Sequence, residues 1–460
     1  MTTQIVTTDS LVLTRTRSPA LPVAPTEYSR QYHDQLNNIL RLYFNTLDNF
    51  IAQLMANTST LPISIDGTNT DAFGRLRVSQ PYTLFDSQNR YASDNQFDNS
   101  TTGTGSATFN TDQSSVSMTV TAGGAGSVVR QSFRNMPYQP GKGLLLLATF
   151  VMDTSNSVNL TQRVGYFNTQ NGVFFQKLDG VNSFVLRTNT SGTPSDARTV
   201  NQDDWNGDKL DGTGASGYTL DLSHPQILWM DFEWLGVGSV RCGFIINGEY
   251  IVCHTFNTAN VYGTTVYMTT AILPVRYEIT STSAIAASMT QICASVVSEG
   301  GFEQTSVDHV ARRTTVLGSI GSTFLPLVSI RLNSARLGSV VLPNRIQVLP
   351  TTNQNYEVAL IKNAELTGAS WANVTTDSNV QYDVTASATA NGSIVQTDYV
   401  TTSGSGGTGN LSSPTGYNWD LQLGVSLANV SDTYTVAIRT VSGATTGDAV
   451  ASFSFYDLTQ

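Results

Sequence analysis

Asp231 and Glu233 are the two residues of this sequence whose type and spacing best fit a catalytic pair. Glycosidases that retain the anomeric configuration use two carboxyl groups about 5–5.5 Å apart. Residues i and i+2 on one face of a strand lie about 6.5–7 Å apart along the backbone, and Trp229 on the same face offers a ring to a sugar. Some glycosidases on sandwich folds carry a third carboxylate on this strand, where this chain has Leu235. The pattern therefore favours a polar outer strand face, and a glycan-degrading hydrolase of the tailspike type is kept as the alternative.

The segment 203–218 is rich in carboxylate and amide side chains of the kind that bind calcium. Its candidate ligands are Asp204, Asn206, Asp208 and Asp211. Lys209 stands where an EF-hand loop needs glycine, and no glutamate occupies the twelfth position. We expect turns stabilised by these short polar side chains, and the sequence leaves calcium binding by residues 204–211 open.

Other motifs for cofactor or metal chemistry are incomplete. Residues 404–409 match the letters of a dinucleotide-binding GxGxxG, but no helical pattern follows them, which indicates a linker or a hairpin tip. Residues 140–143 lack the glycine spacing and the Ser/Thr of a phosphate-binding loop. The cysteines and histidines show no metal-ligand spacing. We therefore expect no cofactor, no metal site and no enzymatic activity.

Composition narrows the range of partners. Charged residues make up only 13% of the 460 residues, and the formal net charge is −10. Nucleic-acid binding requires a basic face, so we expect no nucleic-acid partner. No run reaches the roughly 18 apolar residues of a membrane span, and the N-terminal residues lack the pattern of a signal peptide. We expect synthesis in a cytoplasm and no membrane insertion.

Cys242 and Cys253 lie on either side of the strongest hairpin signal in the chain, Asn247-Gly248. Counting outward from a two-residue turn places Cys242 directly opposite Cys253, on one face with Phe244. We expect two reduced thiols packed in a core, since disulfides are rare in proteins made in a cytoplasm. This register also predicts that mild oxidant links the two cysteines within one chain.

Residues 27–56 form the one strongly helical segment of the sequence, with Thr26 as its expected N-cap. Its apolar residues recur in an eleven-residue pattern, which is typical of a near-straight helical bundle. The stripe is wider than a two-stranded seam requires, because Leu40, Leu42, Phe44 and Ile51 extend it. A lone helix cannot bury this stripe, so we expect an oligomerisation and docking helix that forms a homotrimer. After Tyr28, the contact residues are Tyr32, Leu36, Ile39, Tyr43, Leu47, Phe50 and Leu54.

The pattern of the remaining sequence predicts short strands separated by frequent turns. The predicted fold class is all-β, with tandem β-sandwich or jelly-roll domains of a lectin-like kind preceded by one long N-terminal α-helix. The expected boundaries are an extended arm at 1–26, the helix at 27–56, an extended linker at 57–106, a large sandwich at 107–300, a connector at 301–345 and a second sandwich at 346–460.

Several long segments carry a resemblance to a known family. They are DAFGRLRVS at 71–79, DKLDGTGASGYTLDLS at 208–223, ILWMDFEWLGVGSVRCGFIINGEYIVCHTF at 227–256 and YMTTAILPVRYEI at 267–279. Over roughly residues 27–345 the chain resembles virion structural proteins of tailed bacteriophages and some large DNA viruses. The helical segment at 27–49 is similar to one in structural genes of marine cyanobacterial phages. The resemblance implies a place in a virus particle and a β-sandwich fold, and it transfers no catalytic residue.

These features together predict a trimeric fibre, spike or decoration subunit. We expect the arm and the helix to dock on capsid or tail proteins, and the sandwiches to project from the particle after assembly in the host cytoplasm. Aromatic and amide side chains are plentiful, so a host-surface glycan is a further expected partner. Head or tail location, the receptor and the number of subunits stay open.

Overall fold

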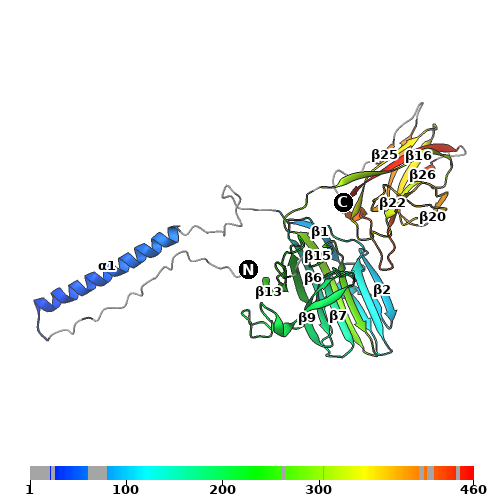
Figure 1. The fold of residues 1–460 in the computed structure, drawn as a ribbon. Coiled ribbons are helices and arrows are strands. Elements are labelled where there is room, and N and C mark those ends of the chain that lie inside the picture. Colours follow the sequence, from blue (N-terminus) through cyan, green and yellow to red (C-terminus); the bar gives the residue numbers. More distant parts are fainter. Residues whose placement is uncertain are drawn as a thin grey trace. The chain divides into compact units, whose positions relative to one another are not determined.

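The structure is a computed structural model of the chain that describes residues 21, 26–261, 265–303, 305–402, 409–411, 419–441 and 446–459, apart from 61–79. It contains two compact units, Met1–Val78 and Ser79–Gln460. Figure 1 shows one helix in the first unit and two groups of strands in the second, coloured from cyan to green and from yellow to red. The motif at residues 71–79 and the glycine-rich residues 404–408 lie outside the described residues.

The first unit contains the helix α1 (Arg30–Thr60). The hydroxyl of Ser29 accepts a hydrogen bond from the N–H of Tyr32 at 3.3 Å, and the carbonyl of Ser29 accepts from His33. Ser29 is therefore the N-cap. The prediction that Thr26 caps a helix over 27–56 is wrong at both ends, because the better-placed serine starts the helix later and the helix continues to Thr60.

The apolar stripe of α1 lies along one side of the helix. Its described members, Tyr32, Leu36, Ile39, Tyr43 and Leu47, are all half-buried, and no described side chain of α1 is buried. The side chains of Phe50 and Leu54 lie outside the described residues. Helices in proteins gain most of their stability from packing an apolar face. Packing of this stripe against another apolar surface would therefore stabilise α1.

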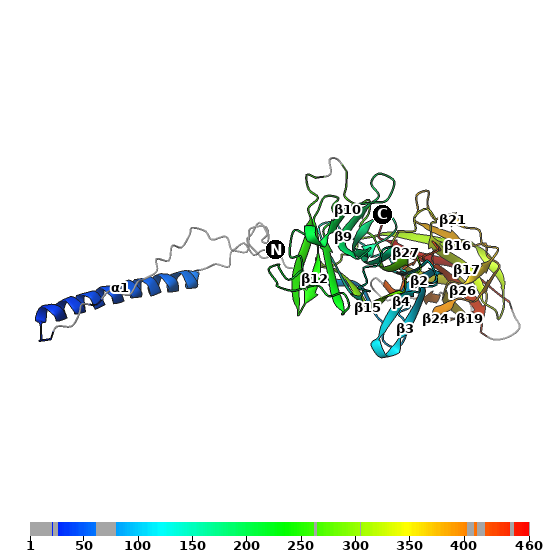
Figure 2. The same ribbon diagram turned by 90° about the horizontal axis from the view of Figure 1, so that it is seen from below.

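The second unit begins with a large β-sandwich of two antiparallel sheets. The eight-stranded sheet has the order β13-β12-β11-β6-β15-β4-β3, with β1 paired to β15, and the seven-stranded sheet has the order β10-β9-β8-β7-β14-β5-β2. Figure 2 shows the hairpin of β3 and β4 in cyan. The bounds are β1 (Tyr82–Gln88), β2 (Phe97–Gly103), β3 (Ser106–Asn110), β4 (Ser115–Val120), β5 (Gly126–Ser132), β6 (Leu144–Val151), β7 (Leu160–Phe167), β8 (Gly172–Leu178), β9 (Val181–Thr188), β10 (Ser195–Asn201), β11 (Gln226–Phe232), β12 (Val240–Ile246), β13 (Glu249–Phe256), β14 (Val275–Ser281) and β15 (Ala287–Ser298), with short 3-10 turns η2 (Thr111–Gln113) and η3 (Gln202–Asp204).

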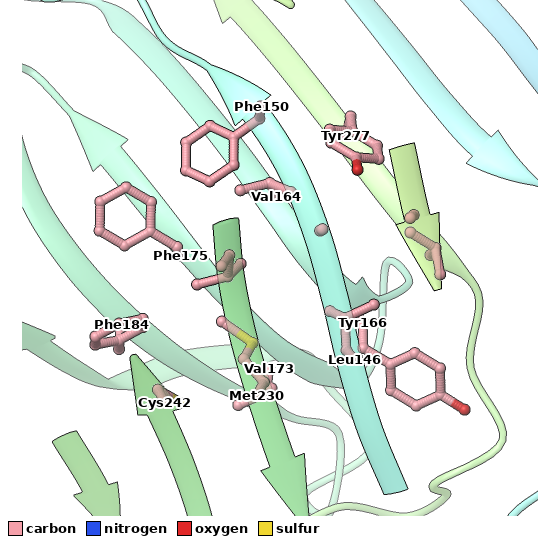
Figure 3. Packing of buried hydrophobic residues seen from close by; sticks show 14 of the residues in the cluster. Leu146, Phe150, Val164, Tyr166, Val173, Phe175, Phe184, Met230, Cys242 and Tyr277 are labelled. Carbon is pink, nitrogen blue, oxygen red and sulfur yellow. The ribbon is translucent and has the colours of Figure 1, made fainter. Parts of the chain in front are cut away.

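An aromatic core joins the two sheets of this sandwich (Figure 3). Phe150 on β6 and Phe244 on β12 come from the eight-stranded sheet, and Phe175 and Phe184 come from β8 and β9 of the seven-stranded sheet. All four are fully buried. The ring centroids of Phe175 lie 6.1 Å from Phe150 and 5.3 Å from Phe244. Alternation of apolar and polar residues along these strands places the rings between the sheets.

A second sandwich follows, with a core of its own. Its sheets have the orders β16-β27-β18-β25 and β21-β22-β17-β26-β19-β24, and β20 pairs with β23. The bounds are β16 (Val307–Ile320), β17 (Leu325–Leu332), β18 (Val341–Pro350), β19 (Asn355–Lys362), β20 (Glu365–Thr367), β21 (Ala372–Asn373), β22 (Val380–Asp383), β23 (Ala388–Ala390), β24 (Ser393–Thr401), β25 (Gly409–Leu411), β26 (Thr433–Thr440) and β27 (Gly447–Asp457), with the 3-10 turn η4 (Trp419–Leu421).

The predicted fold class is confirmed: the chain is all-β, with tandem β-sandwiches preceded by one long N-terminal helix. Two of the expected boundaries are wrong. The linker predicted for 57–106 contains β1 and β2, which pair with β15 and β5 of the large sandwich. The connector predicted for 301–345 contains β16 and β17, which pair with β27 and β26 of the second sandwich. Polar edge strands such as β2 lack the apolar alternation that marks a strand in sequence.

The hairpin of β12 and β13 turns at Asn247-Gly248 as predicted, with positive φ at both residues (53° and 86°). The expected register holds as far as Gly243, which pairs with Val252, and then a bulge shifts it so that Cys242 pairs with His254. The prediction that Cys242 faces Cys253 is therefore wrong. The bulge coincides with the place where the loop after η3 attaches to β13, since the N–H of Gly207 donates to the carbonyl of Cys253 at 2.9 Å.

Cys242 and Cys253 are buried free thiols in the core of the large sandwich. Burial raises the pKa of both thiols, that of Cys242 well above its ordinary value. Because only the thiolate reacts readily, we expect brief iodoacetamide treatment at pH 8 to leave both cysteines unmodified in the native protein and to modify both after denaturation. Peptide mass spectrometry measures this. Labelling of native Cys242 or Cys253 at the rate of the denatured chain would show that the β12–β13 hairpin is not packed in the core.

Candidate functional site

Asp231 and Glu233 do not form the catalytic pair considered from the sequence. Asp231 on β11 lies opposite Arg241 on β12, and both of its carboxylate oxygens accept hydrogen bonds from that guanidinium group, one of them at 2.8 Å. Glu233 lies beyond the end of β11 and is exposed. Trp229 is buried, with its indole N–H donating to the carbonyl of Ile251 at 3.2 Å. The ring is thus unable to serve as an open platform for a sugar.

Glu299 is a carboxyl group near this ion pair that the sequence did not single out. Burial raises its pKa, the negative charge of Asp231 raises it further, and the positive charge of Arg241 opposes the shift. A raised pKa suits an acid catalyst, but hydrolysis of a glycosidic bond needs a second, available carboxylate. The neighbouring Asp231 is held by Arg241 at both oxygens, so it is not available as that second carboxylate.

The acidic loop at 203–218 is organised by hydrogen bonds of its own. Asp208 accepts from the N–H groups of Ser216 (2.7 Å) and Leu210 (2.9 Å). Burial alone would raise the pKa of Asp208, but these hydrogen bonds outweigh it and lower the pKa. Asn206 pairs with the backbone of Thr255, Asp211 accepts from Thr213, and Asp204 ends η3. In the described parts of the chain, no group of three His, Cys, Asp or Glu side chains is placed to hold a metal ion.

A polar cleft lies within the second unit, where the two sandwiches meet. The carbonyl of Phe133, just after β5, accepts from the N–H of Val425 at 2.8 Å. The side-chain amide of Gln422 donates to the carbonyl of Asn135 at 2.8 Å. These bonds tie the segment 133–135 of the large sandwich to the segment 422–425 of the second one. We call the adjoining hollow the interdomain cleft.

The interdomain cleft has a volume of about 520 Å³. Its lining is mostly hydroxyl, amide and backbone groups, with the ring of Phe133 and two arginines. The lining residues are Ser100, Val129, Gln131, Phe133, Asn135, Asn168, Thr169, Gln170, Pro274, Arg276, Ser334, Ala335, Arg336, Leu337, Gly338, Val425, Ser426, Leu427 and Asn429.

Several of these polar side chains are not used to hold the fold together. Among the described residues, the side chains with no hydrogen-bond partner include those of Asn135, Gln170, Asn429, Ser100, Thr169 and Ser334. Amides and hydroxyls both donate and accept hydrogen bonds. Exposed polar side chains commonly bond to solvent. Here they converge on one hollow that falls within the size range of ligand sites, about 300–1,000 Å³.

Beside Arg276 the cleft adjoins a second hollow of about 320 Å³, since Arg276 and Thr169 line both. We call it the arginine pocket and define it by Arg163, Arg187, Arg276, Asp196 and Glu278. The pocket lies on the outer face of the seven-stranded sheet. The pairing of the strands brings these side chains together. Arg163 on β7 lies between Glu278 on β14 and Gln176 on β8. Arg187 comes from β9.

The floor of the arginine pocket is aromatic. Phe167 and Phe174 are fully buried on this outer face, with their ring centroids 4.4 Å apart. The guanidinium carbon of Arg187 lies 5.0 Å and that of Arg163 5.5 Å from the centroid of Phe174, and that of Arg276 lies 5.6 Å from Phe167. Such cation–π contacts fix the guanidinium groups in place.

Burial governs the electrostatics of the pocket. It lowers the pKa of Arg163 and of Arg276, while Glu278 raises both and Arg187 lowers both again. For Asp196, burial acts to raise the pKa, but hydrogen bonds from Arg187 outweigh it and the pKa is lowered. These arginines were not selected from the sequence. Each is a single arginine in an ordinary strand pattern, and only the pairing of β7, β8, β9 and β14 reveals the cluster.

Comparisons with known proteins show no family model and no curated protein that matches the chain. Solved structures with some similarity include the carbohydrate recognition domain of Emp47p (9% identity, TM-score 0.30, 51% of this chain and 100% of that chain). Arcelin-5, a lectin-like defense protein from Phaseolus vulgaris, gives 11% identity and a TM-score of 0.29 over 48% of this chain and 100% of that chain. A legume lectin-like domain from Entamoeba histolytica gives 10% and 0.27 over 43% and 89%. Identities and TM-scores this low leave the function to be inferred from the side chains themselves.

Proposed function

We propose that this chain is a non-enzymatic structural subunit of a virus particle that attaches to surface glycans through the interdomain cleft. The observation that carries the attachment role is the cleft itself, with its converging amide and hydroxyl groups. Sugars present many hydroxyl groups and an apolar ring face. Amide and hydroxyl side chains match the former, and the ring of Phe133 in the cleft suits the latter.

The virion role is proposed on the family resemblance of the sequence and on the helix α1. Its half-buried stripe supports self-association, and we propose a homotrimer that docks on capsid or tail proteins. Assembly would take place in the host cytoplasm, and the subunit would reside in the virion as a fibre, spike or decoration protein. Of the described helices, none is long and apolar enough to cross a membrane.

Glycan binding in the interdomain cleft should depend on the polar side chains that line it. Replacing both Asn135 and Gln170 by Ala removes two side chains that line the cleft and have no partner among the described residues. Hydrogen bonds contribute about 0.5–1.5 kcal/mol each, so we expect the affinity of the full chain for its glycan to fall about tenfold. A glycan microarray identifies the ligand, and calorimetric titration measures the affinity.

The matched control is the double variant Gln113→Ala and Asn353→Ala, which removes one exposed glutamine and one exposed asparagine away from the cleft. This control should bind as the wild type does. Failure of the wild type to bind any glycan would refute the attachment role. Release of reducing ends from the bound glycan, lost in Asp231→Asn, would favour the hydrolase instead.

A further inference from the structure

We infer that the arginine pocket binds the carboxylate group of an acidic sugar, so that the glycan recognised in the adjoining cleft carries uronic acid units. This inference rests on the proposed glycan attachment and narrows it to a substrate class. The pocket and the cleft share Thr169 and Arg276. One oligosaccharide can therefore occupy the cleft and place a ring substituent in the pocket.

The net charge of the arginine pocket favours an anionic ligand. Three guanidinium groups face two carboxylates in the pocket, which leaves an excess of one positive charge. The arginine side chains are largely shielded from solvent, with exposed fractions of 10% for Arg276, 12% for Arg187 and 21% for Arg163. Each arginine forms an ion pair, but Arg163 and Arg276 share the single carboxylate of Glu278, so one positive charge has no carboxylate of its own. A buried charge that is incompletely paired is costly. A single monovalent anion neutralises the pocket.

The arrangement of the guanidinium N–H donors also favours a carboxylate ligand. Arg187 is fully engaged, since its Nε and Nη2 donate to Asp196 at 2.7 Å and its Nη1 donates to the carbonyl of Asn168 at 3.1 Å. Arg163 uses Nε and Nη1 for Gln176 and Glu278, and Arg276 uses Nε and Nη1 for Glu278 and Gln131.

The Nη2 groups of Arg163 and Arg276 have no acceptor among the described residues. Arginine forks match the two oxygens of a carboxylate in geometry as well as in charge. Because the aromatic floor already holds the guanidinium groups in place, little ordering is required when the anion binds. Two open donors beside one uncompensated charge fit a carboxylate better than a neutral hydroxyl group.

The test uses the full chain and three probes: oligosaccharides of galacturonate, mannuronate and glucuronate, each compared with its methyl ester. The ester keeps the size of the substituent and removes its charge. We expect at least one acid to bind at least tenfold more tightly than its ester, and Arg163→Gln to remove most of that difference. Arg331→Gln is the matched control, since Arg331 also stacks on an aromatic ring, Trp371 at 4.2 Å, but lies in the second sandwich.

The possible results distinguish the carboxylate site in the arginine pocket from the proposed glycan attachment through the cleft. Equal binding of acids and esters overturns the carboxylate site while leaving glycan attachment intact. If sulfated oligosaccharides, measured alongside as a fourth set of probes, bind and all three uronates do not, the carboxylate assignment is overturned in favour of sulfate. An acid preference that survives Arg163→Gln overturns the inference, and its loss in Arg331→Gln would assign the carboxylate site to the second sandwich. A chain that binds no glycan at all, charged or neutral, refutes both proposals.

Discussion

Replacing Leu36, Ile39, Tyr43 and Leu47 by Ser is expected to convert the proposed homotrimer into monomers. These residues form the half-buried stripe of α1, and no described side chain of that helix is buried within its own unit. Each large apolar side chain contributes about 1.5–3 kcal/mol when it is fully buried, so the four substitutions remove most of the driving force for association. Analytical ultracentrifugation of the full chain measures the change.

The control for this variant places Ser at four polar positions of the same helix: Gln35, Asn38, Asn45 and Asn49. It carries the same number of substitutions but keeps the stripe, so it should sediment as the wild type does. The two sandwiches should stay folded in both variants, because their cores contain no residue of α1. A stripe variant that sediments as the parent oligomer would assign assembly to the sandwiches.

Phe175→Ala is expected to destabilise the large sandwich by about 3–5 kcal/mol, the usual cost of removing a buried phenyl ring. Phe175 is fully buried and contacts Phe150, Phe184 and Phe244, so the cavity would open between the two sheets (Figure 3). Chemical denaturation followed by tryptophan fluorescence measures the change.

Leu178→Ala provides a comparison within the same strand, β8. Leu178 is 40% exposed, so its truncation should cost less than about 1 kcal/mol. Similar, small effects of Phe175→Ala and Leu178→Ala would contradict face-to-face packing of the two sheets through this aromatic cluster.

Local patterns predicted the elements of the fold better than their partners. Alternation around Asp231 predicted the strand that is β11, and Asn247-Gly248 predicted the hairpin turn because its backbone preference is local. The register beyond Gly243 was not predictable, since the bulge at Cys253 coincides with the attachment of Gly207, which lies 46 residues earlier in the chain. Likewise, β1 pairs directly with β15, although almost the whole large sandwich lies between these two strands in the sequence.

The candidate site was the least predictable part of the molecule. The sequence drew attention to Asp231 and Glu233 because two carboxylates stand close together in the chain. The register of β11 and β12 instead gives Asp231 a structural partner, Arg241. The arginine pocket depends on contacts between strands that are distant in sequence, and the interdomain cleft depends on bonds such as that from Gln422 to Asn135. Long-range pairing of this kind leaves no local signal.

The most direct test of glycan attachment through the interdomain cleft is an experimental structure of the full chain bound to its tightest oligosaccharide from the microarray. We expect the sugar to lie in the interdomain cleft, in contact with Asn135 and Gln170 and within hydrogen-bonding distance of Arg276. An oligosaccharide bound elsewhere on the chain, with the cleft empty, would contradict this attachment.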